Sequence, residues 1–303
     1  MFEKMLTLQL ELLLMMIVGF IVKKKKIISV QQQKGLSELL LNVILPATII
    51  KSFITSSGLS TDLLANSISM MATCLIIQIV LIITLPILLR PFKEKAKIME
   101  YGLLVSNSSF IGLPVIEYLF DSQAVMYASI YLIPFRFIMW TVGLSLFTDE
   151  LDLKSGLKKM LLHPCIISVV IGSLIMLLHI QLPQAITGTV EMISSASNCL
   201  SMITIGAVLA DIKWNKLLDL STIAFTIARL IILPLIVYYV LSLLKADGLL
   251  IDIAVLMSAM PCGSTCPVLA QKYDKDYEFA AKLVLITSIL STITIPCICL
   301  LLD

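Results

Sequence analysis

Apolar residues occur along this chain in ten long runs that are separated by short polar connections. A helix needs about 20 apolar residues to cross the hydrocarbon core of a bilayer, and the runs are close to that length. Backbone groups cannot stay unpaired in lipid, so each run is predicted to be a membrane helix. The predicted spans are residues 5–22, 38–56, 66–89, 98–119, 123–147, 162–180, 184–210, 217–243, 249–271 and 277–301.

The composition agrees with a chain that is embedded in the lipid bilayer. Of its 303 residues, 59% are hydrophobic and 14% are charged, whereas about a quarter of a soluble domain is charged. The first apolar run is followed by its basic cluster, so it is interpreted as a retained helix and not as a signal peptide. A net charge of +2 gives no reason to expect a nucleic-acid partner.

The distribution of basic residues predicts the orientation. Most of the 22 Lys and Arg lie in connections that follow odd-numbered helices, whereas the opposite side is assigned Lys4, Lys51 and Lys245. Positively charged loops stay in the cytoplasm, so both termini of this multi-pass chain are expected on the outer side of the cytoplasmic membrane.

The two halves of the chain share a short motif. Leu113-Pro114-Val115 late in helix four recurs as Cys266-Pro267-Val268 late in helix nine, and Asp121 and Asp274 keep the same separation. Five helices per half would give the halves opposite orientations. Inverted repeats with interrupted helices at matching positions point to the midplane binding site of a secondary transporter, although so short a match also arises by chance in apolar sequence.

Helices four and nine each contain a polar segment with helix breakers, Ser106 to Pro114 and Pro261 to Pro267. An internal proline costs about 3 kcal/mol in a straight helix, so both helices are predicted to be broken where they line a cavity. The N-termini of half-helices there would suit a carboxylate, and the Asn107 amide can donate to an anion. The candidate substrate-binding residues are Asn107, Ser108, Gly112, Pro114, Pro261, Gly263, Ser264, Thr265 and Pro267.

Other polar residues inside the apolar runs have two interpretations each. Arg136 in helix five should face protein or water, where it neutralises a substrate anion or pairs with Glu117. Arg229 and Lys282 are expected to extend toward the membrane surface. Possible contacts from the other helices, or simply interhelical hydrogen bonds, are expected from Asn42, Thr48 and Asn198.

The spacing of Asn107, Gly112 and Pro114 resembles the fourth helix of the auxin efflux carrier family, the PIN-like carriers. The segment AMPCGSTCPVLAQKYD, residues 259–274, resembles that family's ninth helix, and Leu45-Pro46-Ala47 resembles its second. The resemblance implies an all-α integral membrane fold of two inverted five-helix repeats, residues 1–150 and 151–303, whose broken helices four and nine cross at mid-membrane.

The resemblance also implies a mechanism. Helices 1, 2, 6 and 7 would form a scaffold, and helices 3–5 and 8–10 would form a transport domain that moves like an elevator. Asn107 would contact the substrate carboxylate, and Pro114 and Pro267 would mark the crossover. The short central connection, Asp149 to Lys159, is similar to that of malate or malonate permeases. The expected partners are a small organic anion, the lipid bilayer and a second copy in a homodimer.

Three other classes of function are alternatives to an organic-anion transporter. An enzyme is disfavoured because the only histidines, His163 and His179, form no HExxH motif, and neither a cofactor nor a metal site is indicated. A channel or a non-transporting receptor would also have a polar midplane. A sodium-coupled symporter of the bile-acid type should have more polar side chains around the crossover than Asn107 and Glu117.

Overall fold

The structure is a computed structural model, and it describes residues 2–55, 61–148, 153–210 and 219–302. Within these residues every regular element is helical, as predicted. Five helical stretches of the described chain are long and apolar enough to cross a membrane: Val30–Thr55, Ala65–Leu88, Ser122–Thr148, Leu220–Leu243 and Tyr277–Cys299. Shorter apolar helices are Ser108–Leu119, Pro164–Leu177 and Gly248–Ala259. Ten crossings in two inverted repeats stay a prediction.

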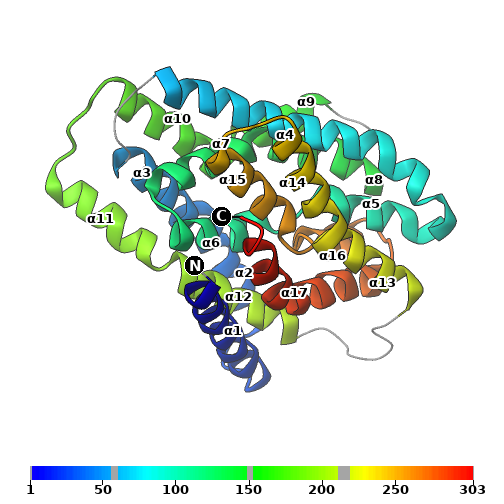
Figure 1. Cartoon of the computed structure of the whole chain (residues 1–303). Coiled ribbons are helices and arrows are strands. Elements are labelled where there is room, and N and C mark those ends of the chain that lie inside the picture. Colours follow the sequence, from blue (N-terminus) through cyan, green and yellow to red (C-terminus); the bar gives the residue numbers. More distant parts are fainter. Residues whose placement is uncertain (1, 56–60, 149–152, 211–218, 303) are drawn as a thin grey trace. The chain divides into compact units, whose positions relative to one another are not determined.

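The chain divides into two compact units, which are described separately. Residues 1–68, 109–130 and 161–211 form the first unit. Its helices, which Figure 1 colours along the chain, are α1 (Phe2–Lys24), α2 (Val30–Leu39), α3 (Leu45–Thr55), α6 (Leu113–Leu119), the first part of α7 (Ser122–Ile138), α10 (Pro164–Leu177), α11 (Gln184–Ser195) and α12 (Ser197–Ala210).

The second unit contains residues 69–108, 131–160 and 212–303. Its helices are most of α4 (Thr61–Leu88), α5 (Ala96–Leu104), the end of α7, α8 (Leu144–Thr148), α9 (Leu153–Leu161), α13 (Leu220–Ile227), α14 (Leu233–Leu243), α15 (Gly248–Ala259), α16 (Thr265–Lys272) and α17 (Tyr277–Cys299). Each unit draws on both halves of the sequence. The predicted domains 1–150 and 151–303, and the scaffold and transport domains, stay predictions.

Glycines let α1 and α12 approach closely in the first unit. A Cβ atom at Gly19 would lie 2.1 Å from the Ile203 carbonyl oxygen, and one at Gly206 would lie 1.9 Å from that of Met16. No side chain fits at either position, so the two backbones are in direct contact. Small residues bring membrane helices together in this way, where packing replaces the hydrophobic effect.

Three membrane helices widen just before a Leu-Pro pair. Single π-helical turns cover Leu40–Ile44, Ser108–Gly112 and Ala228–Ile232, and Pro46, Pro114 and Pro234 follow them. Proline lacks an N–H and its ring clashes with the carbonyl one turn earlier. The wider turn relieves that clash: the N–H of Leu45 bonds to the Leu40 oxygen, five residues back.

Two predicted helix boundaries differ from the structure. Helix two begins at Val30, earlier than expected, because Ser29 and Gln32 form a reciprocal capping box at its start. The predicted span 184–210 is divided into α11 and α12, since Ala196 ends α11. The start of helix two is therefore set by its polar capping residues and not by the length of its apolar run.

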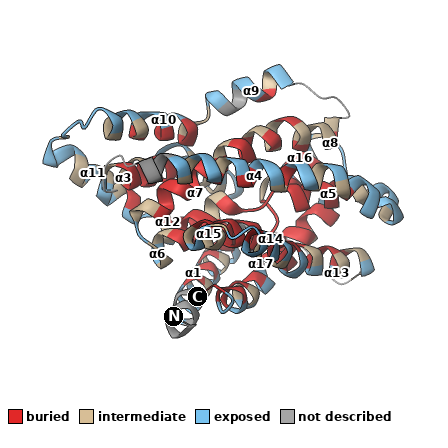
Figure 2. Ribbon diagram, turned by 45° about the horizontal axis from the view of Figure 1, so that its top comes forward, coloured by how far each residue is buried: buried red, intermediate tan, exposed pale blue. Residues whose placement is uncertain are grey.

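Burial differs strongly between helices, as Figure 2 shows. Helix α15 is buried over most of its length, whereas α4 exposes large aliphatic side chains such as Ile76, Ile83 and Leu88. Exposed apolar side chains of this size are unfavourable in water and favourable in lipid. The burial pattern therefore agrees with a multi-pass membrane protein.

Candidate functional site

Both predicted helix breaks are present, and the extended segments at which they begin lie in the second unit. Helix α5 ends at Leu104, after which Val105 has extended backbone angles of φ −114° and ψ 103°. Helix α15 ends at Ala259, after which Met260 has φ −62° and ψ 145°. The two extended segments then meet as an antiparallel bridge between Ser106 and Cys262. Broken helices four and nine thus touch at their breaks.

Backbone hydrogen bonds join the two breaks directly. The Asn107 N–H donates to the Pro261 oxygen at 2.8 Å, and the Gly263 N–H donates to the Val105 oxygen at 2.9 Å. A Cβ atom at Gly263 would lie 3.0 Å from the same Val105 oxygen. Each break therefore supplies partners that the other lost, which satisfies backbone groups that lipid cannot.

Serine hydroxyls attach this bridge to α15. The hydroxyl of Ser108 donates to the Met257 oxygen at 3.1 Å and is hydrogen-bonded to the hydroxyl of Ser106. Asn107 lies between these two serines and is 4% exposed. Its backbone is held on both sides, so the orientation of the backbone at Asn107 is fixed.

Two further polar contacts stabilise the crossover, one between the two broken helices and one from a neighbouring helix. The Tyr101 hydroxyl of α5 lies 2.8 Å from that of Thr265, the first residue of α16. The Thr287 hydroxyl of α17 accepts from the Cys262 N–H at 3.1 Å. The crossover is therefore held both by a contact between α5 and α16 and by a contact from α17.

Arg229, in the π-helical turn of helix eight, contacts the backbone at both helix breaks. Its Nη1 donates to the Leu103 oxygen at 2.7 Å, and its Nε donates to the Met260 oxygen at 2.9 Å. Arg229 is 2% exposed, so the expectation that it extends to the membrane surface is wrong. Lys282, by contrast, is half-buried.

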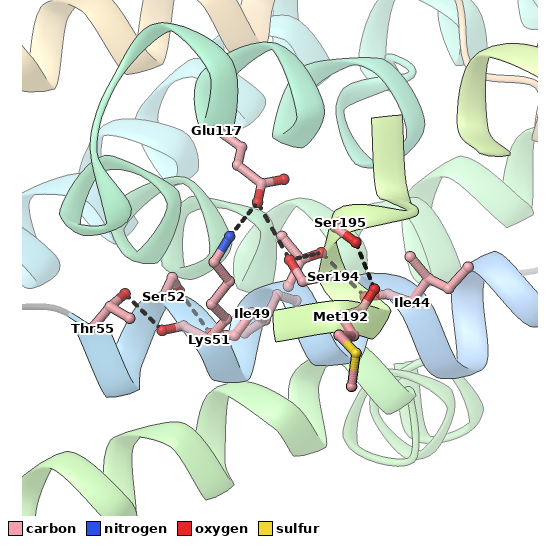
Figure 3. Close-up of polar contacts among 10 residues, drawn as sticks. Ile44, Ile49, Lys51, Ser52, Thr55, Glu117, Met192, Ser194 and Ser195 are labelled. Atoms are coloured by element: carbon pink, nitrogen blue, oxygen red, sulfur yellow. Dashed lines mark hydrogen bonds and ion pairs between the residues drawn. The ribbon is translucent and has the colours of Figure 1, made fainter. Parts of the chain in front are cut away.

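A second polar cluster lies in the first unit, around Glu117 of α6 (Figure 3). The Lys51 ammonium of α3 lies 3.1 Å from Glu117 Oε1. The Ser194 hydroxyl of α11 lies 3.3 Å from the same oxygen and 3.1 Å from the Thr48 hydroxyl. Glu117 is therefore paired with Lys51, one of the basic residues that the charge distribution assigns to the outer side of the membrane.

The remaining predicted residues are distributed over both units. Arg136 is 2% exposed in the second unit, and Ser264 is half-buried there beside the crossover. Pro267 is buried and is the third residue of α16. Gly112 and Pro114 are buried in the first unit. Nothing in the geometry assigns any of these residues to a substrate.

The three polar residues that could make contacts from other helices differ in their surroundings. Asn42 is exposed, and Thr48 is 1% exposed and donates to the Ile44 oxygen. Asn198 has a buried side-chain oxygen without a hydrogen-bond partner. Of these three, Thr48 alone is joined to the Glu117 cluster among the described contacts.

The large pocket of the second unit is unsuited to an anion. It has a volume of about 380 Å³ and lies between α4 and α14. Its lining is almost entirely aliphatic, and an anion needs donors or positive charge. The polar crossover is therefore the better candidate site.

Tyr101, Ser194 and Thr287 were not expected at either polar cluster, the Lys51–Glu117 ion pair was not expected, and Arg229 is buried instead of reaching the membrane surface. A lone lysine within an apolar run was a usable signal, because a charge in lipid requires a partner. The tyrosine and the hydroxyl residues gave no signal, since such residues are common in membrane helices.

A broken-helix crossover inside a set of lipid-compatible helices is typical of membrane transporters. The family model of membrane transport proteins matches residues 4–152 and 150–299. The chain therefore belongs to this family, the auxin efflux carrier-like family indicated by the motifs of helices four and nine. It is also 25% identical over 297 residues to an uncharacterized transporter of Methanothermobacter thermautotrophicus, covering 95% of each chain.

Proposed function

We propose that this membrane transport protein is a secondary transporter of small organic anions, mono- or dicarboxylates, in the cytoplasmic membrane. The observation that carries the proposal is the backbone bridge between the two helix breaks at Asn107 and Pro261. The bridge fixes the backbone of Asn107, whose side-chain amide can donate to an anion, in a chain that belongs to a family of transporters.

The proposed mechanism is alternating access by an elevator movement. The crossover would travel with the transport domain, helices 3–5 and 8–10, past a scaffold of helices 1, 2, 6 and 7. The hydrogen bonds that brace the crossover support this proposal, because a site that moves as a body must keep its internal geometry. The proposal includes an extracytoplasmic location for both termini and a homodimer.

Uptake of labelled malate, malonate and indole-acetate into proteoliposomes tests the substrate class. Wild type should take up one of them with saturation, and Asn107→Ala should reduce its kcat/KM by tenfold or more, about 1.4 kcal/mol. Asn66→Ala is the matched control, because Asn66 is a half-buried asparagine of α4 with no role in the crossover. Equal loss in both variants would point to a folding defect and would contradict the proposed site.

The same preparation separates the alternatives. Exchange of internal for external substrate is expected of a carrier, whereas ion currents too fast for alternating access would identify a channel. An absolute requirement for sodium would favour the bile-acid type of symporter. No uptake of any anion by folded protein would contradict the proposed function.

A further inference from the structure

The guanidinium of Arg229 contacts the ends of both broken helices at once. Leu103 is in the last turn of α5, and Met260 is the extended residue that directly follows the end of α15. The guanidinium donates to the carbonyl oxygens of both residues. Carbonyls in the last turn of a helix have no donor within the helix, so each of these ends requires an outside partner.

The charges of these groups balance. The C-terminal end of a helix carries roughly half a negative elementary charge, so two such ends together match about one positive charge. Among the described residues, no carboxylate forms an ion pair with Arg229. A buried guanidinium without a counter-ion would be costly in a membrane. The two helix ends therefore serve as its counter-ion.

The space beside the guanidinium is small and polar. A pocket of about 10 Å³ is lined by Arg229, Gln78, Ser106, Tyr131 and Ser258, among other residues. Gln78 donates to the Leu104 oxygen at 3.2 Å, and its own side-chain oxygen is buried without a hydrogen-bond partner. The pocket has room for about one water molecule, so the guanidinium fills most of the space between the two helix ends.

We infer that Arg229 is a built-in cation, which takes the place of a coupling metal ion at the ends of the two half-helices. Transporters with broken helices bind their sodium ions through carbonyls of unwound backbone and of half-helix C-terminal ends. Here the Arg229 guanidinium, a positive charge that belongs to the chain itself, binds the carbonyl oxygens of Leu103 and Met260. Arg229 is a positioning residue, because it acts on the crossover through the backbone oxygens of Leu103 and Met260.

The inference is tested by the thermal unfolding of purified protein in sodium, potassium, choline or dilute guanidinium chloride at equal ionic strength. Wild type should unfold at the same temperature in sodium, potassium and choline, and at a slightly lower temperature in guanidinium, which is a denaturant. Arg229→Ala should unfold at a lower temperature in choline, and sodium or guanidinium should raise its Tm by about 2 °C or more by filling the vacated position. Arg90→Ala, which removes an exposed arginine, should behave as wild type.

Each outcome decides the question. Wild-type Tm that rises specifically in sodium would overturn the inference, since the position would then still need a metal ion. A folded Arg229→Ala that responds to neither cation would overturn it as well. If Arg229 only filled space, Arg229→Ala would be destabilised but its Tm would respond to neither cation. A rise in Tm on adding a cation therefore shows that the positive charge of Arg229 is what holds the crossover.

If Arg229→Ala does not fold, the inference is tested with Arg229→Lys and Arg229→Met instead. Lysine keeps the positive charge with different geometry, whereas methionine keeps much of the length without charge. The inference expects the lysine variant to fold and the methionine variant to fail. Equal behaviour of the two variants would overturn it.

The unfolding measurement needs no transported substrate. It therefore stands even where the proposed function fails, and a failure of the inference leaves the organic-anion proposal intact. Both fail together only if the wild-type protein requires sodium for stability and for uptake.

Discussion

The ammonium group of Lys51 lies 3.1 Å from Oε1 of Glu117, and the two side chains are 28% and 19% exposed. Lys51 is on helix two and Glu117 follows the break in helix four. Under the proposed division of the chain, this ion pair joins the scaffold to the transport domain. An elevator movement would have to separate it, whereas a fixed pore would not.

The strength of this ion pair is accessible to a double-mutant cycle. Lys51→Met and Glu117→Gln should each lower the free energy of unfolding, because each leaves a half-buried partner without its contact. The double variant should be less destabilised than the sum of the single variants, with a coupling energy of about 1 kcal/mol. Additive effects in thermal or denaturant unfolding would show that the pair contributes nothing.

A reversible crosslink between positions 51 and 117 tests the movement itself. Cysteines at both positions, joined by a short bifunctional thiol reagent, should abolish uptake, and reduction should restore it. The exposed Cys199 and Cys297 are first replaced by serine so that the reagent acts only at the new pair. Full uptake by the crosslinked protein would contradict the elevator model, and each single-cysteine variant is the control for modification alone.

The contact between α1 and α12 should not tolerate a side chain. Gly206→Ala places a Cβ atom where the Met16 oxygen lies at 1.9 Å, so the helices must separate. We expect a loss of about 1–3 kcal/mol in the free energy of unfolding, the usual cost of overpacking. Gly188→Ala in α11 is the control, because a Cβ atom there meets nothing within 4 Å. Equal stability of the two variants would contradict the close packing.

Asp219 should make stability depend on pH in the acid range. Burial raises the pKa of its carboxyl, but hydrogen bonds from Lys95 and Thr222 outweigh burial and lower it from the ordinary 3.8 to about 2. Lys95 Nζ lies 2.5 Å from Asp219 Oδ2, and Asp219 also caps α13. A lowered pKa means that the ionised form stabilises the fold.

The sign of this dependence follows from the lowered pKa. The contribution of Asp219 is fully present above the ordinary pKa, and it is lost as the pH falls through about 2. Asp219→Asn keeps much of the cap but has no ionisation, so its unfolding temperature should fall less than that of wild type between pH 4 and pH 2, a range set by these pKa values. Parallel curves for both proteins would contradict the assignment.

The amino-acid sequence by itself determined the helical class, the position of most helices and the two breaks. These features depend on local physics: a bilayer demands long apolar helices, and proline and glycine interrupt them wherever they occur. The motifs around Asn107 and Pro261 also indicated the family correctly. Local rules were sufficient because each of these features is decided within one or two helical turns.

Only the tertiary structure decided which polar groups meet. Lys51 pairs with Glu117, and Arg229 reaches Leu103 and Met260, across separations in sequence that no local pattern encodes. These partners depend on how whole helices pack, and packing is fixed by the shape of many side chains at once. The sequence showed that buried charges needed partners, and the fold supplied them.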